Sequence, residues 1–107
     1  MSHFSCLVQQ GGAADLQRAE LEKRLHTLHE SHHPGETTTF AWRTAAIGFM
    51  YTEGRQSTSS VIQCQLQHPT TRDGREAYMR GVCDIWTDVT GCTDHEIVVS
   101  LSDTASA

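Results

Sequence analysis

The residue best placed for chemistry is the second in the chain. Ser2 is small enough for removal of Met1 to be expected, which would leave a free α-amine and a hydroxyl on one residue. An α-amine has an ordinary pKa of roughly 7.7–8.0, so it can accept a proton near neutral pH, and the hydroxyl could act as a nucleophile. Ser2 is therefore a candidate catalytic residue. The simpler interpretation is that a strand begins there and holds the terminus in place.

A second candidate is a pair of arginines, Arg72 and Arg75, at the start of a predicted helix. The free backbone N–H groups of a helix start, together with guanidinium groups, can bind a carboxylate or a phosphate. We therefore predict that both arginines bind a small carboxylate ligand. The alternative is that they extend into solvent or pair with Asp73 and Glu76.

A third candidate is a cluster of four histidines near the end of another predicted helix: His26, His29, His32 and His33. Spacings of three and four residues place several of them on one helix face, which could hold Zn²⁺ or Ni²⁺ with a further ligand from elsewhere. The alternative is that a polar helix end simply exposes its histidines, whose charge also suits the dipole at the helix carboxyl end. We favour that second interpretation and expect neither a metal nor another cofactor. No P-loop, dinucleotide fingerprint or Gly-x-Ser-x-Gly motif is present.

The composition indicates one small domain spanning residues 1–107. The hydrophobic fraction of 37% is lean, which favours a core completed by burial between subunits. The net charge of −5 argues against nucleic acid or an anionic membrane as a partner. No stretch is typical of a signal peptide or a membrane-spanning helix, so we expect a cytoplasmic protein. Its four cysteines form no Cys-x-x-Cys pair and are expected to be reduced: Cys6, Cys64, Cys83 and Cys92.

Hydrophobic periodicity predicts four strands and two long helices. Strict alternation over 62–67 places three glutamines on one face of a strand, and the nearly continuous apolar run at 96–101 predicts a strand buried on both faces. Leucines at helical spacing predict a buried stripe made of Leu16, Leu21, Leu25 and Leu28. In order, the expected elements are a strand at 2–8, a helix at 13–31, a strand at 37–44, an irregular hairpin or loop at 47–60, a strand at 62–67, a helix from about 71 to 90 with Met79, Val82, Trp86 and Val89 on its apolar face, and a strand at 96–101.

The two halves of the chain look alike, since the run 4–9 is echoed by 62–67 and each strand leads into a helix and a second strand. The predicted fold is therefore α+β with two layers: a duplicated β-α-β unit forming one four-stranded mixed sheet with two helices on one face. Ferredoxin-like domains share this element order. The expected division is repeat one at 2–47, a hairpin loop at 48–60 and repeat two at 61–103. The glutamine face suits a wet interface between subunits better than a dry core.

This pattern resembles the tautomerase superfamily, and within it the cis-3-chloroacrylic acid dehalogenase-like branch. The enzyme 4-oxalocrotonate tautomerase and macrophage migration inhibitory factor look like more distant relatives. The resemblance runs from Ser2 to about Asp103. Its short matches are Leu28-His29, Gly48 and Gly54, Thr71-Arg72 and the run 98–103.

The resemblance implies a trimer or hexamer in which an amino-terminal proline acts as base or acid on small 2-oxo or unsaturated acids. On this basis His29 matches a catalytic helix histidine and Arg72 matches the arginine motif. His68 falls near a second arginine position and Ser100 stands where a tyrosine is expected, so the resemblance makes both of them candidate substrate-binding residues. Ser2 replaces the proline, and the chain ends before the segment that carries the branch's catalytic glutamate.

A well-placed general base contributes about 10²–10⁴-fold to a rate, so the loss of the proline should remove most of the activity. We therefore expect weak or absent keto–enol tautomerase or hydratase activity. The alternative is a catalytically silent subunit or binding module that pairs with a proline-bearing paralogue.

Overall fold

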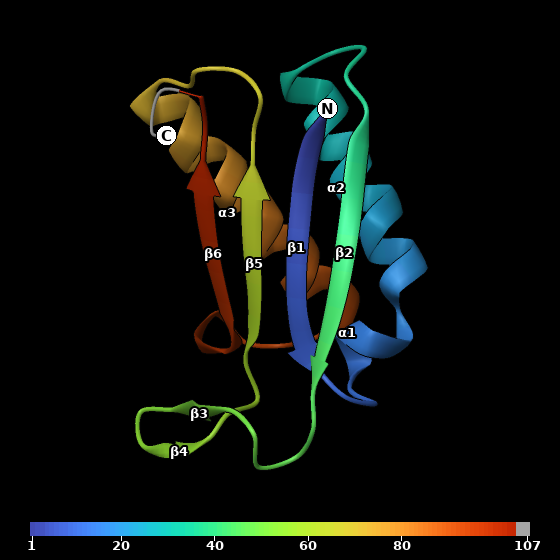
Figure 1. Cartoon of the computed structure of the whole chain (residues 1–107), viewed down its shortest axis with the longest axis vertical. Coiled ribbons are helices and arrows are strands. Elements are labelled where there is room, and N and C mark those ends of the chain that lie inside the picture. The colour runs from blue at the N-terminus through green and yellow to red at the C-terminus, as the bar shows by residue number, and fades with distance from the viewer. Residues whose placement is uncertain (105–107) are drawn as a thin grey trace.

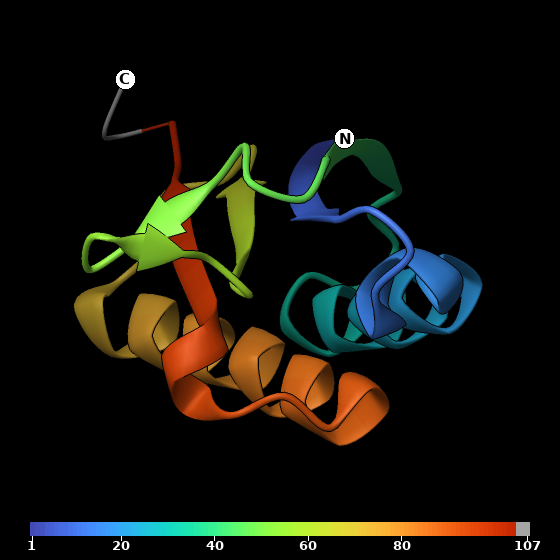
Figure 2. The same ribbon diagram turned by 90° about the horizontal axis from the view of Figure 1, so that it is seen from below.

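Four strands form one mixed sheet, and two long helices cover one of its faces (Figures 1 and 2). The computed structural model describes residues 1–104. The strand order is β2-β1-β5-β6, with β1 parallel to β2, β5 parallel to β6, and the central β1 and β5 antiparallel. The strands are β1 (Ser2–Gln9), β2 (Thr38–Ala45), β5 (Ser60–Gln65) and β6 (Ile97–Ser102); the helices are α2 (Arg18–His32) and α3 (Arg72–Thr90). This arrangement confirms the predicted duplicated β-α-β fold.

The antiparallel pairing of β1 with β5 places the two halves head to tail. Ser2 pairs with Thr38 in the first half, and Ser60 pairs with Ile97 in the second. Each pair joins the beginnings of two parallel strands. The start of β1 and the start of β5 therefore lie at opposite ends of the sheet (Figure 1).

Between the halves, a short hairpin of β3 (Tyr51–Thr52) and β4 (Arg55–Gln56) projects beyond the lower end of the sheet in Figure 1. Its two turn residues, Glu53 and Gly54, both have positive φ, as a tight hairpin turn that matches strand twist requires. The residues leading into it include two of the most exposed large apolar side chains, Ile47 and Phe49, at 80% and 83% exposure.

The core lies between the helices and the covered face of the sheet. Burial alternates along β1, so that Ser2, Phe4, Cys6 and Val8 face the helices. Val82 and Trp86 of α3 are buried as predicted, whereas Met79 and Val89 are half-buried and the neighbouring Tyr78 and Ile85 complete the apolar face. All four cysteines are free thiols. The opposite face is open, and Gln63, Gln65 and Gln67 are exposed on it as predicted.

The ends of α3 follow the expected rules. Thr71 Oγ1 accepts a hydrogen bond of 3.0 Å from the backbone N–H of Gly74, which caps the amino end. Gly91 ends the helix in the left-handed conformation, with φ of 74°. A single 3-10 turn, η1 (Asp94–Glu96), then leads into β6. Within residues 1–104, no helix combines the length and the apolar character needed to cross a membrane.

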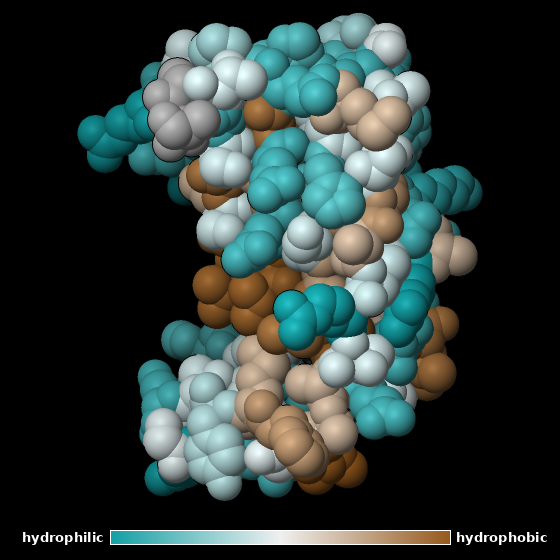
Figure 3. Space-filling model, viewed as in Figure 1, coloured by the Kyte–Doolittle hydropathy of each residue, from teal (hydrophilic) through white to brown (hydrophobic). Residues whose placement is uncertain are grey.

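Two predictions about burial are wrong. The expected helix at 13–31 is interrupted at Gln17 into α1 (Ala13–Leu16) and α2, which turns Leu16 outward to 77% exposure. The last strand is not buried on both faces, because β6 is at the sheet edge and Val98 points to the open face at 53% exposure. Figure 3 shows this open face, where hydrophobic groups gather over its lower half near the hairpin.

Candidate functional site

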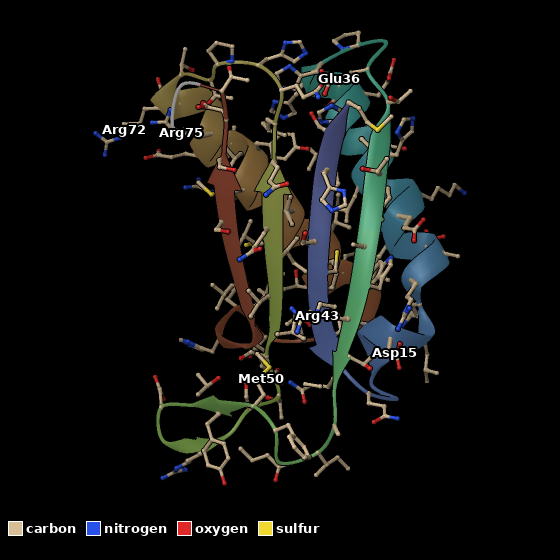
Figure 4. All side chains as sticks on the ribbon, in the orientation of Figure 1. Asp15, Glu36, Arg43, Met50, Arg72 and Arg75 are labelled. Atoms are coloured by element: carbon tan, nitrogen blue, oxygen red, sulfur yellow. The ribbon has the colours of Figure 1, made fainter. Side chains whose placement is uncertain are left out.

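Side chains from separate segments meet around the carboxylate of Glu36 at the start of β1 (Figure 4). The Ser2 hydroxyl donates to Glu36 Oε1, and His29 Nε2 lies 3.1 Å from the same oxygen. His68 Nε2 bonds to the other oxygen, Oε2. Tyr78 joins through a bond of 2.9 Å between its hydroxyl and His29 Nδ1. We call these five residues the Glu36 cluster.

The parallel register of β1 and β2 brings Glu36 to Ser2. Since Ser2 pairs with Thr38, the residues just before Thr38 lie beside the start of the chain. The backbone N–H of Ser2 donates to the carbonyl of Thr37 at 3.1 Å. In the structure Met1 precedes Ser2, so this nitrogen is an amide. From the segment after β5, the N–H of Gln67 donates to Ser2 Oγ at 3.3 Å, and the next residue is His68.

The hydrogen-bond partners define the tautomer of His29. An ionised Glu36 can only accept, so Nε2 of His29 carries the proton and donates it. The other ring nitrogen, Nδ1, is then an acceptor for the hydroxyl of Tyr78. The expected exposure of the histidines is wrong for His29, which is fully buried because it faces the core beside Tyr78. Burial lowers the pKa of His29, an effect that the hydrogen bond to Glu36 opposes only in part. The result is a neutral imidazole held in one orientation.

Glu36 remains ionised in this setting. Desolvation raises its pKa, but the hydrogen bonds from Ser2, His29 and His68 outweigh that effect and lower the pKa to about 2. The Glu36 side chain is 11% exposed. A general base works best when its pKa lies near the operating pH. Glu36 is therefore suited to holding its partners in place and poorly suited to removing a proton from a substrate.

The predicted arginines lie apart from this cluster. Arg72 is 84% exposed at its side chain, pairs with Glu76 at 3.2 Å and points away from the molecule (Figure 4). Arg75 donates from Nη1 to the carbonyl of Thr70 at 3.1 Å and to its hydroxyl at 3.3 Å. The pairing of Arg72 with Glu76 is the alternative that the sequence left open.

Of the remaining candidates, Ser100 and His26 lie outside the cluster, whereas His32 contacts it through Tyr78. Ser100 is exposed on the open face of the sheet, opposite the face to which Ser2 belongs. His26 bonds to Thr38 at 3.0 Å, and His32 packs edge-on against the Tyr78 ring at 5.2 Å between centroids. Among residues 1–104, no three His, Cys, Asp or Glu side chains are arranged to hold a metal ion.

The structure thus brings Ser2, His29 and His68 together and adds two residues that sequence reasoning missed, Glu36 and Tyr78. A signal for Glu36 was available. Two predicted strands that begin near residues 2 and 37 of a β-α-β unit pair in parallel, which places residue 36 next to residue 2. For Tyr78 the sequence held no comparable signal, because its partner His29 comes from another helix.

A cavity of about 200 Å³ adjoins the Glu36 cluster. Tyr78 forms part of its wall, and so does His33, which packs against the rings of both His29 and His68 at 5.1 and 5.2 Å. Burial, followed by the proximity of His68, lowers the pKa of His33. The other lining residues are His32, Leu66, Pro69, Thr70, Thr71 and Gly74.

Comparison with solved structures places the fold. A scan against protein-family models and a search of curated proteins find no match to this chain. The structure of native Ps01740 superposes with a TM-score of 0.87 at 21% identity, over 98% of this chain and 97% of that one. N1, a member of the cis-3-chloroacrylic acid dehalogenase family, gives 0.85 at 14% identity over 94% and 73%. A fused 4-OT, solved as a symmetric trimer, gives 0.82 at 15% identity over 94% and 84%. The chain therefore has the tautomerase-superfamily fold.

Proposed function

We propose that this chain is a divergent tautomerase-superfamily protein with weak or absent tautomerase or hydratase activity toward small 2-oxo or unsaturated carboxylates. The observation that carries the proposal is the contact between the Ser2 hydroxyl and the ionised Glu36. If Met1 is removed, the new amine of Ser2 lies within a few ångströms of that carboxylate. A negative charge at this range favours the protonated amine, which cannot act as a base.

The test is an assay of phenylpyruvate enolisation and of 3-haloacrylate hydration. Mass spectrometry first establishes whether Met1 is present, and periodate oxidation reports a free amine on Ser2. We expect wild type and Arg72→Ala to give the same rates, close to buffer. Rates well above buffer in wild type that fall at least tenfold in Arg72→Ala would contradict the proposal and indicate a working enzyme.

We also propose that the chain forms a homo-oligomer, most simply a trimer. Fused 4-OT neighbours of the same fold are trimers, and the open face of this sheet carries exposed Val98 beside exposed polar side chains. We expect wild type to be trimeric by native mass spectrometry and Val98→Glu to dissociate it. Leu16→Glu is the matched control, because Leu16 is equally apolar and more exposed but lies on α1, away from the open face. A monomeric wild type at micromolar concentration would exclude the trimer.

A second candidate function is a silent subunit that pairs with a proline-bearing paralogue. The fused 4-OT proteins include asymmetric trimers, so this fold accommodates non-equivalent subunits. Co-expression with a paralogue, followed by native mass spectrometry, tests it. Mixed trimers would support this function, and homotrimers alone would count against it.

A further inference from the structure

We propose that a cavity at the start of β5 is a second ligand-binding site, which holds a small amide through the Ser60 hydroxyl and the Trp86 indole N–H. This cavity, which we call the Ser60 cavity, has a volume of about 280 Å³. It lies at the end of the sheet opposite the Glu36 cluster, because β1 and β5 begin at opposite ends (Figure 1). The inference goes beyond the proposed function, since it concerns another site and binding alone.

The repeated fold explains the position of the Ser60 cavity. The cavity beside the Glu36 cluster takes its wall from the end of α2 and from the segment that follows β5. The Ser60 cavity takes its wall from the end of α3 and from the segment that follows β1. Ser60 is the counterpart of Ser2, because each is the buried first residue of a central strand. The two cavities therefore occupy corresponding positions in the two halves.

The two corresponding hydroxyl groups differ in their partners. The Ser2 hydroxyl donates to Glu36. Glu96, the counterpart of Glu36, instead accepts hydrogen bonds from the N–H and the hydroxyl of Thr93. Ser60 is only 6% exposed, and its hydroxyl makes no hydrogen bond to any other part of the chain that the structure describes. Buried polar groups are nearly always hydrogen-bonded, so this hydroxyl is available to a molecule in the cavity.

Trp86 supplies a second unpartnered group in the same wall. Its side chain is 1% exposed, and Nε1 has no hydrogen-bond partner among the described residues. The neighbouring Trp42, whose ring stacks on that of Trp86 at 6.0 Å between centroids, shows the satisfied state: its Nε1 donates to Glu22 at 2.7 Å. An indole N–H can only donate, and a buried donor without an acceptor is destabilising. An acceptor oxygen of a ligand in the cavity removes that cost.

The wall of the Ser60 cavity defines the chemistry of the ligand. The indole N–H and the Ser60 hydroxyl can both donate to a carbonyl oxygen. The carboxylate of Glu96, also in the wall, accepts from Thr93 and Thr58 and has capacity for one further donor. An amide presents a carbonyl oxygen and an N–H group in one flat unit. The volume lies just below the usual range of about 300–1,000 Å³ for ligand pockets, so the ligand is small.

The experiment follows the two indole N–H signals of ¹⁵N-labelled protein during titration with benzamide. Trp42 and Trp86 are the only tryptophans, and Trp42→Phe assigns the signals by removing one of them. We expect benzamide to shift the Trp86 signal saturably, with a Kd on the order of 1 mM. The Trp42 signal is the internal control and should move much less, because Glu22 already accepts from its N–H. Toluene, which keeps the ring and lacks the amide, should leave the Trp86 signal in place.

Ser60→Ala removes the proposed hydroxyl contact and should raise the Kd of benzamide about fivefold. Ser100→Ala is the matched control and should leave the Kd unchanged, because Ser100 is exposed on the open face of the sheet.

Three results with wild type overturn the proposal without any variant: no saturable shift of the Trp86 signal, equal shifts of both indole signals, or an equal effect of toluene. An unchanged Kd in a folded Ser60→Ala protein overturns it as well. None of these outcomes depends on turnover of phenylpyruvate or 3-haloacrylate, so a failure of this site is distinguishable from a failure of the proposed function.

Discussion

The two halves of the molecule place a glutamate in the same topological position and surround it differently. Glu36 precedes β2 and lies beside Ser2, the first residue of β1; Glu96 precedes β6, whose first residue pairs with Ser60, the first residue of β5. Glu36 receives hydrogen bonds from buried Ser2 and His29. Glu96 instead bonds to the backbone and hydroxyl of Thr93 in a capping box on the surface.

The comparison separates what the repeated fold supplies from what the side chains supply. Parallel pairing within each β-α-β unit brings a helix-to-strand connection next to the start of the first strand in both halves. Hydrogen bonds lower the pKa of both carboxyl groups. For Glu96 the largest contribution comes from the backbone N–H of Thr93. Only in the first half does the network continue into the core, through His29 to Tyr78. The histidine side chains around Glu36 therefore turn the same position in the fold into a buried hydrogen-bonded cluster, whereas Glu96 only caps a turn at the surface.

The largest expected contrast is between Glu36→Ala and Glu96→Ala. Removing Glu36 leaves two buried donors, Ser2 Oγ–H and His29 Nε2–H, without acceptors, so we expect a loss of about 3 kcal/mol in the free energy of unfolding. Removing Glu96 takes away a surface cap and should cost about 1 kcal/mol or less. Urea unfolding measures both. Equal losses would show that the cluster contributes no more than a helix cap.

The next contrast is in the response to acid. The folded-state pKa of Glu36, about 2, is below its ordinary 4.5, so its contribution is complete above pH 4.5 and is lost between 4.5 and 2. The contribution of Glu36 to the free energy of unfolding is at most about 3 kcal/mol. The pKa values of His29 and His33 are also lowered in the folded protein. As the pH falls, the unfolded chain therefore binds protons at these two histidines before the folded protein does, and stability begins to fall below about pH 6.5. Urea unfolding from pH 8 to 3 should show both losses.

Variants assign the two parts of that acid response. Glu36→Gln should remove most of the loss below pH 4.5, whereas Glu96→Gln should leave it nearly intact. His29→Gln should reduce the loss that begins near 6.5. A wild-type stability that is flat from pH 8 to 5 would contradict a neutral, buried His29.

The smallest contrast is between the two serines that open the central strands. Ser2→Ala removes the donor to Glu36 and the acceptor of the Gln67 N–H, and should cost about 1–2 kcal/mol. Ser60 lines an open cavity at the other end, where water can replace a protein partner, so Ser60→Ala should change stability by about 0.5 kcal/mol or less. Thermal and urea unfolding of the two variants measure the difference. A larger loss for Ser60→Ala would reverse the comparison.

The sequence by itself determined the order of the elements and the faces of most of them. Alternation in β5, the Thr71 cap and the Gly91 stop are local patterns, and local backbone preferences and side-chain periodicity decide such features. It also placed Ser2 and His29 among the residues worth examining. It failed for Leu16 and Val98, whose exposure depends on a helix break and on which strand forms the sheet edge.

Only the tertiary structure decided which candidates meet. Ser2, His29, Glu36 and Tyr78 come from a strand, a helix, a loop and a second helix, and no local pattern records the distance between them. The same is true of Arg72 and Ser100, whose residue types suit substrate binding but which lie on a solvent-facing helix turn and on the open face of the sheet. Chemistry of this kind requires contact between side chains, and contact follows from strand register and helix packing, which join residues far apart in the chain.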